Sequence, residues 1–229
     1  MQLYPLFPIL HSILKPIFPD CLWEGDRHWK TIALTFDDGP HPQYTPQLLQ
    51  VLDRYRITAN FFWLGACVNR WPAIAKSVCD RKHGIGLHGF EHHNFPMLAP
   101  HDLKLSLEKT QAAISRTCNL QPPQVRYVRP PNGLFTPKTL QYLRQWNYIT
   151  VMWSIVPEDW QRPGITTVVR RVLENVKNGS IIVLHDGDCG GEDVAKITDI
   201  LLPPLLQQGY QFVTIDTLWQ QAKGKKIND

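Results

Sequence analysis

The chain alternates between short continuous apolar runs and longer segments in which apolar residues recur every three or four positions. The apolar runs are rich in β-branched and aromatic residues, which is typical of buried β-strands. From His28 onward this pattern predicts seven strands, near residues 31–37, 59–64, 85–88, 126–129, 149–154, 180–185 and 211–215.

The segments between the predicted strands have the apolar spacing of helices with one buried face. Such spacing is clear in two sets, Leu48, Leu49, Leu52, Tyr55 and Leu103, Leu107, Thr110, Ile114. Proline is favourable in the first turn of a helix, where its missing N–H would have had no partner. Helix starts are therefore indicated at Thr45-Pro46, Trp71-Pro72 and Thr136-Pro137, and another near Pro100.

Seven strands separated by helices imply parallel pairing, in either a βα barrel or an open doubly wound sheet. Neither a G-x-G-x-x-G after the first strand nor a P-loop lysine is present, which argues against a nucleotide-binding doubly wound sheet. With 229 residues and no visible inter-domain linker, we expect one α/β domain over residues 29–229.

Residues 1–28 form an apolar amino-terminal segment that prolines interrupt. No positive charge precedes its apolar part, and its longest unbroken apolar stretch is shorter than a signal-peptide core. The segment is also too short and too broken to span a membrane. We expect it to wrap over hydrophobic surface of the domain. An atypical export signal, or a peripheral contact of residues 1–20 with a membrane surface, are the alternatives.

The amino-acid composition argues against several classes of protein. A hydrophobic content of 43% supplies a substantial core, so folding needs neither a metal nor disulfides. The formal net charge is +4, but no basic stripe or RNA-binding signature accompanies it, so we expect no nucleic-acid partner. The five cysteines are odd in number and lack C-x-x-C pairs, which argues against a disulfide framework or a zinc ribbon.

Chemically active side chains recur where the predicted strands end. In chain order they are Asp37 and Asp38, His88 with His92 four residues on, Arg129, and His185. In a βα barrel the carboxyl ends of the strands meet at one rim. Adjacent carboxylates there repel each other and lose hydration unless a cation compensates. The pattern predicts a metal site together with acid–base groups.

Five motifs that contain these residues resemble those of the NodB-type polysaccharide deacetylases, carbohydrate esterase family four. They are TFDDGP from Thr35, HGFEH from His88, RPPNG from Arg129, VPEDW from Val156 and IIVLH from Ile181. The resemblance covers roughly residues 29–218, and TFDDGP is highly specific. It implies a distorted, incomplete (β/α) barrel of about seven parallel strands and metal-dependent removal of acetyl groups from N-acetylated sugars.

The resemblance also implies roles for individual residues. Asp38, His88 and His92 would bind one divalent metal and leave positions for water and substrate. This ligand set suits zinc, with cobalt or another first-row metal as alternatives. Asp37 would be the general base for the attacking water, and Arg129 would keep it ionised and oriented.

The remaining implied roles concern the leaving group, the oxyanion and the sugar. His185 would protonate the departing amine, and the backbone N–H of Asn132 would help the metal to stabilise the tetrahedral oxyanion. Trp160 and Pro131 would contact the substrate.

The chain departs from the usual motifs of the family at three positions. Gly89 replaces a serine or threonine, so a hydrogen bond that braces the loop is expected to be lost. Asn132 replaces an aromatic residue, which removes a sugar-facing side chain and keeps the backbone donor. Val156 replaces an aspartate that supports the acid histidine, so we expect apolar surroundings to lower the pKa of His185.

The expected activity is therefore N-deacetylation of a glycan that contains N-acetylglucosamine, either chitin-like or peptidoglycan-like. An acetylxylan esterase, a deformylase of lipid-linked sugars and a non-catalytic sugar-binding descendant are the alternatives. Val156 and Asn132 motivate the last of these. A family that acts on walls and exopolysaccharides points to the envelope or to secretion, whereas the missing export signal points inside the cell.

Overall fold

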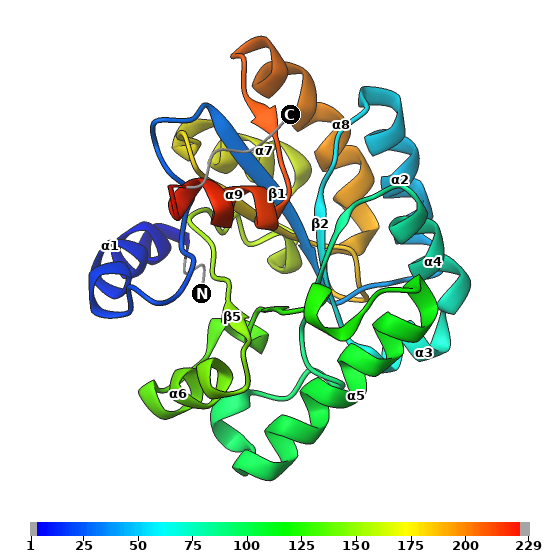
Figure 1. Ribbon diagram of the computed structural model, residues 1–229. Helices are drawn as coiled ribbons and strands as arrows, with labels where there is room; N and C mark the ends of the chain where they lie inside the picture. The colour runs from blue at the N-terminus through cyan, green and yellow to red at the C-terminus, as the bar shows by residue number, and fades with distance from the viewer. Residues whose placement is uncertain (1–3, 225–229) are drawn as a thin grey trace.

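The computed structural model describes residues 4–224 and shows one parallel sheet that curls into an incomplete barrel (Figure 1). The strands are β1 (Thr31–Asp37), β2 (Asn60–Trp63), β3 (Gly84–Leu87), β4 (Tyr127–Val128), β5 (Ile149–Thr150), β6 (Ile181–His185) and β7 (Gln211–Phe212). Their order is β5-β4-β3-β2-β1-β6, with β7 beside the start of β1. Every pairing is parallel, so the predicted fold class is confirmed.

An isolated bridge joins the two ends of the sheet. β4 and β5 contain only two residues each, and regular pairing stops after Thr150. Further along the chain, Ile155 forms a parallel bridge with Ile182 of β6, and the N–H of Val183 donates to the carbonyl of Ile155 over 3.1 Å. The barrel is distorted on this side, and the fifth strand is shorter than the sequence predicts.

Helices surround the curled sheet, most of them over its outer face, with α1 at the edge of the molecule (Figure 1). They are α1 (Phe7–Ile17), α2 (Tyr44–Tyr55), α3 (Gly65–Arg70), α4 (Pro72–Asp80), α5 (Pro100–Cys118), α6 (Pro137–Gln145), α7 (Ile165–Asn175), α8 (Gly191–Gln207) and α9 (Ile215–Ala222). α8 packs against α2 and α7, and α5 packs against α3 and α4.

The alternation of side chains between the two faces of β1 places Asp37 inside the barrel. Ile32, Leu34 and Phe36 point outward into the main core beneath the helices, and all three are fully buried. Ala33 belongs to a smaller cluster inside the barrel, which α9 helps to close. Because successive side chains of a strand point to opposite faces, Asp37 lies on the inner side, at the end of the strand.

Three of the four predicted helix starts are found where the sequence indicates them, and one of these is α5 at Pro100. α4 begins at Pro72 directly after Trp71. α6 begins at Pro137, and the side chain of Thr136 accepts a hydrogen bond from the N–H of Thr139 over 3.1 Å. This is the expected N-cap, which satisfies an N–H that has no partner within the helix.

The fourth predicted start, at Thr45-Pro46, is different. α2 begins at Tyr44, so Thr45 lies inside the helix and is not its cap. The Thr45 hydroxyl accepts a hydrogen bond from the N–H of His41 over 2.8 Å and donates one to the carboxylate of Asp186 over 2.5 Å. The hydroxyl therefore does not cap the helix that follows it; it joins the backbone of His41 to the buried carboxylate of Asp186.

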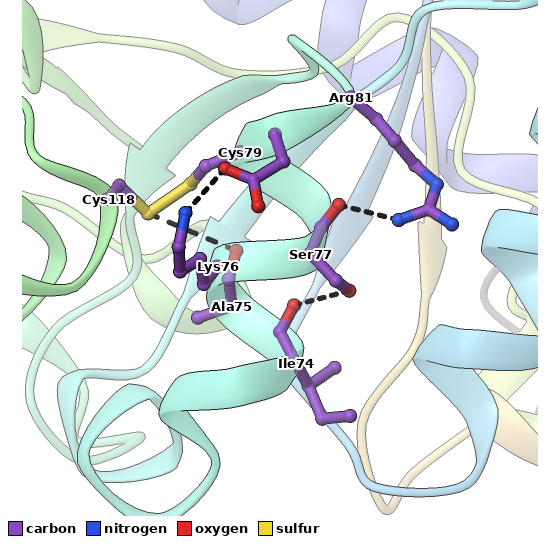
Figure 2. The surroundings of a disulfide bond; sticks show 8 residues. Ile74, Ala75, Lys76, Ser77, Cys79, Arg81 and Cys118 are labelled. Carbon is purple, nitrogen blue, oxygen red and sulfur yellow. Dashed lines mark hydrogen bonds and ion pairs between the residues drawn. A yellow bond between two sulfur atoms is a disulfide. The ribbon is translucent and has the colours of Figure 1, made fainter.

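A disulfide joins Cys79, near the end of α4, to Cys118 at the end of α5 (Figure 2). The cysteine count argued against a disulfide framework and did not predict this single bridge. The two helices pack against each other and bring the Cα atoms of residues 39 positions apart to 5.8 Å. Cysteine spacing carries no information about that packing. The other three cysteines, Cys21, Cys67 and Cys189, are free.

The amino-terminal segment packs against the rest of the chain as a helix followed by an extended stretch. Pro8 is tolerated because it lies in the first turn of α1, where its missing N–H has no helical partner, and Pro16 lies in the last turn, where it affects only the end of the helix. Leu22 then pairs with Val151 beyond the end of β5 and is buried in the inner cluster. No helix within residues 4–224 is both long enough and apolar enough to cross a membrane.

Candidate metal and catalytic site

The carboxyl ends of the strands border a cavity of about 610 Å³. Eight of the nine predicted site residues line it: Asp37, Asp38, His88, His92, Arg129, Asn132, Trp160 and His185. Parallel register brings them together, because Asp37 pairs with His185 across β1 and β6. Pro131 is the exception. It is buried and does not line the cavity, whereas its neighbour Pro130 does.

Asp38, His88 and His92 form a cluster in which the ligand atoms all lie within 4.8 Å of one another. The Oδ1 atom of Asp38 is 3.4 Å from Nε2 of His88 and 3.4 Å from Nε2 of His92. Asp38 follows β1 with a φ of 75°, in the left-handed region. The chain turns there, which lets two adjacent aspartates face different partners.

The donor atoms of this cluster fit a divalent cation. Nδ1 of His88 donates to the carbonyl of Arg129 over 2.7 Å, since a carbonyl only accepts, and this leaves the Nε2 lone pair for a metal. Burial lowers the pKa of His88, so its ring is neutral at pH 7. Oδ1 of Asp38 is buried and has no hydrogen-bond partner among the described residues. Such an atom is costly unless a cation compensates it.

Asp37 has a different partner, the buried guanidinium of Arg129. Nη1 of Arg129 donates to the Asp37 carboxylate over 2.7 Å and to the Thr35 hydroxyl over 2.8 Å. Nη2 donates to the Met152 carbonyl over 3.0 Å, and the guanidinium carbon lies 4.1 Å from the centre of the Phe62 ring. Burial lowers the pKa of Arg129, and the Asp37 carboxylate opposes that change. The pair holds one carboxylate in a fixed position beside the metal cluster.

His185 is supported by the carboxylate of Asp159. Nδ1 of His185 lies 2.9 Å from Oδ1 of Asp159, and the backbone N–H of His185 donates to Oδ2 over 2.7 Å. Burial alone lowers the pKa of His185, but the charge and hydrogen bond of Asp159, together with the charges of Asp38 and Asp37, outweigh it, and the pKa is raised to about 9. The imidazole is therefore protonated at neutral pH.

The expectation that Val156 leaves His185 with a lowered pKa is wrong. Val156 is buried and does not line the cavity. Within the same motif the chain turns at Glu158, whose φ is 59°, and the next residue, Asp159, presents its carboxylate to His185. Sequence position within the motif did not identify which acidic residue makes the contact.

Aromatic side chains flank His185 on the cavity wall. The ring of Trp160 meets that of His185 edge-on, with centroids 5.0 Å apart. Phe7 of α1 meets Trp160 edge-on at 6.4 Å, and Trp153 also lines the cavity. Sequence reasoning missed both Phe7 and Trp153. Trp153 at the end of a predicted strand was a usable signal, whereas nothing in the amino-terminal segment pointed to Phe7.

Asn132 lies in the turn Pro131–Gly133 that follows β4, with a φ of 56°. Asparagine tolerates this left-handed conformation better than most residues do. Its side-chain amide donates to Oδ1 of Asn94 over 2.8 Å. The side chain that replaces the usual aromatic residue thus ties this turn to the loop that follows β3.

The loop that carries His88 and His92 is braced although Gly89 has no side chain. Gly89 has a φ of 88°, a conformation that favours glycine. At the start of α3, the N–H of Ala66 donates to the carbonyl of Phe90 over 2.9 Å. The hydroxyl of Ser106 accepts from the N–H of Phe90 over 2.8 Å. Ser106 on α5 therefore makes a bracing hydrogen bond from a neighbouring helix.

Asp186 is a buried carboxyl group to which the sequence assigned no role. Its N–H donates to the carbonyl of Asp37 over 3.1 Å, and it accepts the hydrogen bond from Thr45. Burial raises its pKa to about 7. A Cβ atom at Gly39 would lie 2.5 Å from both Asp186 carboxylate oxygens, so the close approach requires glycine directly after Asp38.

Comparison with known proteins agrees with this geometry. The family model described as polysaccharide deacetylase matches residues 24–151. A peptidoglycan-N-acetylglucosamine deacetylase of Bacillus cereus is 35% identical over 198 residues, which cover 86% of this chain and 91% of that protein. A chitooligosaccharide deacetylase of Sinorhizobium fredii is 34% identical over 166 residues, 72% of this chain and 76% of that protein.

The fold is also that of a solved deacetylase. A peptidoglycan N-acetylglucosamine deacetylase, crystallised in complex with 4-naphthalen-1-yl-N-oxidanyl-benzamide, superposes with a TM-score of 0.84 at 27% sequence identity. The match covers 90% of this chain and 95% of that one. Sequence, fold and relatives together show that the chain belongs to the polysaccharide deacetylase family and is a hydrolase of that class.

Proposed function

We propose that this protein removes the N-acetyl group from N-acetylglucosamine units of a glycan, with one divalent metal held by Asp38, His88 and His92. The observation that carries the proposal is the unpartnered, buried Oδ1 of Asp38, which lies 3.4 Å from Nε2 of each histidine. The same cavity holds a fixed carboxylate and a protonated histidine, the two groups that hydrolysis of an amide requires.

One carboxylate and two imidazoles are a donor set that suits zinc, and cobalt or another first-row metal can use the same donors. When bound, such an ion supplies Lewis-acid chemistry toward the acetyl carbonyl and lowers the pKa of a coordinated water.

Asp37 acts as the general base in this proposal. Its carboxylate takes a proton from the water that attacks the acetyl carbon, and the 2.7 Å hydrogen bond from Arg129 fixes its position. Arg129 also donates to the Thr35 hydroxyl and the Met152 carbonyl, so its guanidinium is held in place and in turn holds the Asp37 carboxylate.

Asn132 and His185 act on the two ends of the breaking bond. The backbone N–H of Asn132 donates to the oxyanion that forms from the acetyl oxygen. His185 gives a proton to the nitrogen of the departing amine, which is too basic to leave unprotonated. With Nδ1 bound to Asp159, the opposite ring nitrogen carries the proton that is transferred, and a pKa of about 9 keeps it in place at neutral pH.

The sugar would contact the aromatic part of the cavity wall. Trp160 offers an apolar face to a sugar ring, supported by Phe7 behind it. Pro131, which is buried, shapes the turn of Asn132 instead of contacting the substrate. The catalytic domain comprises residues 29–229, and residues 1–28 add Phe7 to its cavity.

A mass-spectrometric screen tests the proposal. Purified protein with added zinc or cobalt is incubated with chitin oligomers, peptidoglycan fragments and acetylated xylan, and loss of acetyl is scored, with Asp38→Ala as the matched inactive control. We expect acetyl loss from chitin oligomers or peptidoglycan. Loss from xylan alone would identify an esterase, and no loss from any of them in metal-loaded protein would favour the non-catalytic alternative.

A further inference from the structure

The helix α1 exposes a row of large apolar side chains on its outer face. Ile9, Leu10, Ile13 and Ile17, together with Leu6 directly before the helix, are between 45% and 59% exposed. Their spacing of three or four residues places them along one side of the helix. Exposed apolar residues scattered singly are normal, but a contiguous row on a helix marks an interaction surface.

The opposite face of α1 is fixed to the protein. Phe7 contacts Trp160, the His11 ring lies 5.9 Å from that of Trp23, and Phe18 just beyond the helix packs edge-on against Phe135 at 5.0 Å. Because the inner face is held by these contacts, the outer row is presented outward in a defined orientation. In Figure 1, α1 stands at the edge of the molecule, away from the helices that cover the sheet.

The charges next to α1 favour an anionic partner. α1 contains no acidic residue. A groove of about 870 Å³ at its carboxyl end is lined by Lys15, Arg144 and Lys223, and by the two carboxylates of Asp20 and Glu24. Asp20 pairs with Arg144 and Glu24 with Lys15, so the charged residues of the groove sum to a net charge of +1, which Lys223 supplies. In sequence, two more lysines follow Lys223 within the last six residues.

We propose that the outer face of α1, with Lys223 in the groove beside it, docks on the surface of an anionic lipid bilayer. An apolar helix face lying in the plane of the interface with cations beside it is the arrangement that binds such surfaces. A second copy of this chain is a poorer occupant. A helix of 11 residues is about 16 Å long and offers a footprint of about 200 Å², whereas a stable interface buries about 800 Å² on each partner.

The proposal goes beyond the deacetylase function and has a consequence for it. Phe7 belongs to the inner face of α1 and also lines the catalytic cavity. A bilayer seated on the outer face would therefore lie within one helix diameter, about 10 Å, of the cavity wall. The enzyme would act on glycan close to the membrane surface.

Vesicle sedimentation tests the proposal. Purified protein is mixed with sucrose-loaded vesicles of phosphatidylcholine, either alone or with 30% phosphatidylglycerol, and the bound fraction is measured. We expect binding to the anionic vesicles, and the double substitution Ile9→Gln/Ile13→Gln should weaken it at least about tenfold. Arg144→Gln/Lys223→Gln should weaken binding to anionic vesicles and leave any binding to neutral vesicles unchanged.

The matched control is Leu105→Gln/Ile200→Gln. These residues are 39% and 45% exposed on α5 and α8, so the control removes similar apolar surface from other helices. It should bind vesicles as the unmodified protein does. Equal binding by the α1 variant, or no binding by the unmodified protein, overturns the proposal. So does sedimentation of the unmodified protein as a dimer that Ile9→Gln/Ile13→Gln dissociates, because the occupant is then a second copy.

Discussion

Asp37 and Asp38 are adjacent in sequence, yet they have separate environments. Asp37 ends β1 on the inner side of the barrel and is bound to Arg129. Asp38 has a left-handed backbone conformation and faces His88 and His92. The turn between strand and loop separates a carboxylate paired with an arginine from one that has no lysine or arginine partner within residues 4–224.

Substitution should separate their roles. Asp37→Asn should retain the metal and lower kcat by about a hundredfold or more, as expected when a general base is removed. Asp38→Ala should lose the metal itself, because one of three ligands is gone. Metal content by mass spectrometry and kcat on a chitin oligomer check both. A metal-free Asp37→Asn alongside a metal-loaded Asp38→Ala would reverse the assignment.

The pair formed by Asp159 and His185 makes a prediction about pH. A general acid must be protonated, so activity is lost as pH rises through its pKa, which lies at about 9 for His185. Asp159→Asn removes the largest of the charges that raise this pKa, so burial has more weight and the pKa falls. The alkaline limb of the kcat/KM profile should therefore move to lower pH.

Asp188→Asn is the control for this prediction. Asp188 also lines the cavity but makes no recorded contact with His185 among the described residues. Its substitution should leave the alkaline limb in place. An unmoved limb in folded Asp159→Asn protein, or an equal movement in Asp188→Asn, would show that Asp159 does not set the pKa of the acid.

At the scale of elements, the disulfide between α4 and α5 links the two helices that flank β3 and the metal-binding loop in the chain. It closes a loop of 39 residues, for which the chain-entropy estimate is about 4 kcal/mol of stabilisation. Cys79→Ala/Cys118→Ala should lower the free energy of unfolding by about that amount, measured by urea denaturation.

The free cysteines provide the control for this prediction. Cys189→Ala removes an exposed free thiol and should leave the unfolding midpoint unchanged. Thiol titration of unfolded, unreduced protein should count three free thiols. A count of five, with no loss of stability in the double variant, would contradict the bridge.

At the scale of the whole molecule, metal binding and folding should be separable. The core beneath the helices consists of apolar side chains contributed by most strands and helices, and the metal cluster lies outside it. Protein stripped by a chelator should keep its far-UV circular dichroism and lose activity, and added zinc should restore activity and raise Tm. Full activity in protein whose metal content is measured as nil would contradict metal dependence.

Most of the sheet was predictable from sequence because its strands are buried on both faces. Such strands are continuous apolar runs, so their positions are local information. The predicted strand over residues 149–154 was too long, because after Thr150 the backbone pairs with Leu22 from the amino-terminal segment. α1 was not predicted as a helix, since its prolines look like interruptions until their places in its first and last turns are known.

The sequence by itself determined the alternation of strands and helices, which follows from local periodicity, and the barrel class and eight side chains of the cavity, which follow from the resemblance of its motifs to those of the family. Tertiary structure alone decided the partners: Asp159 for His185, Ser106 for the loop of Gly89, and Cys118 for Cys79. These contacts join residues far apart in the chain. Their existence depends on which helices and turns pack together, and no local pattern of residues records that packing.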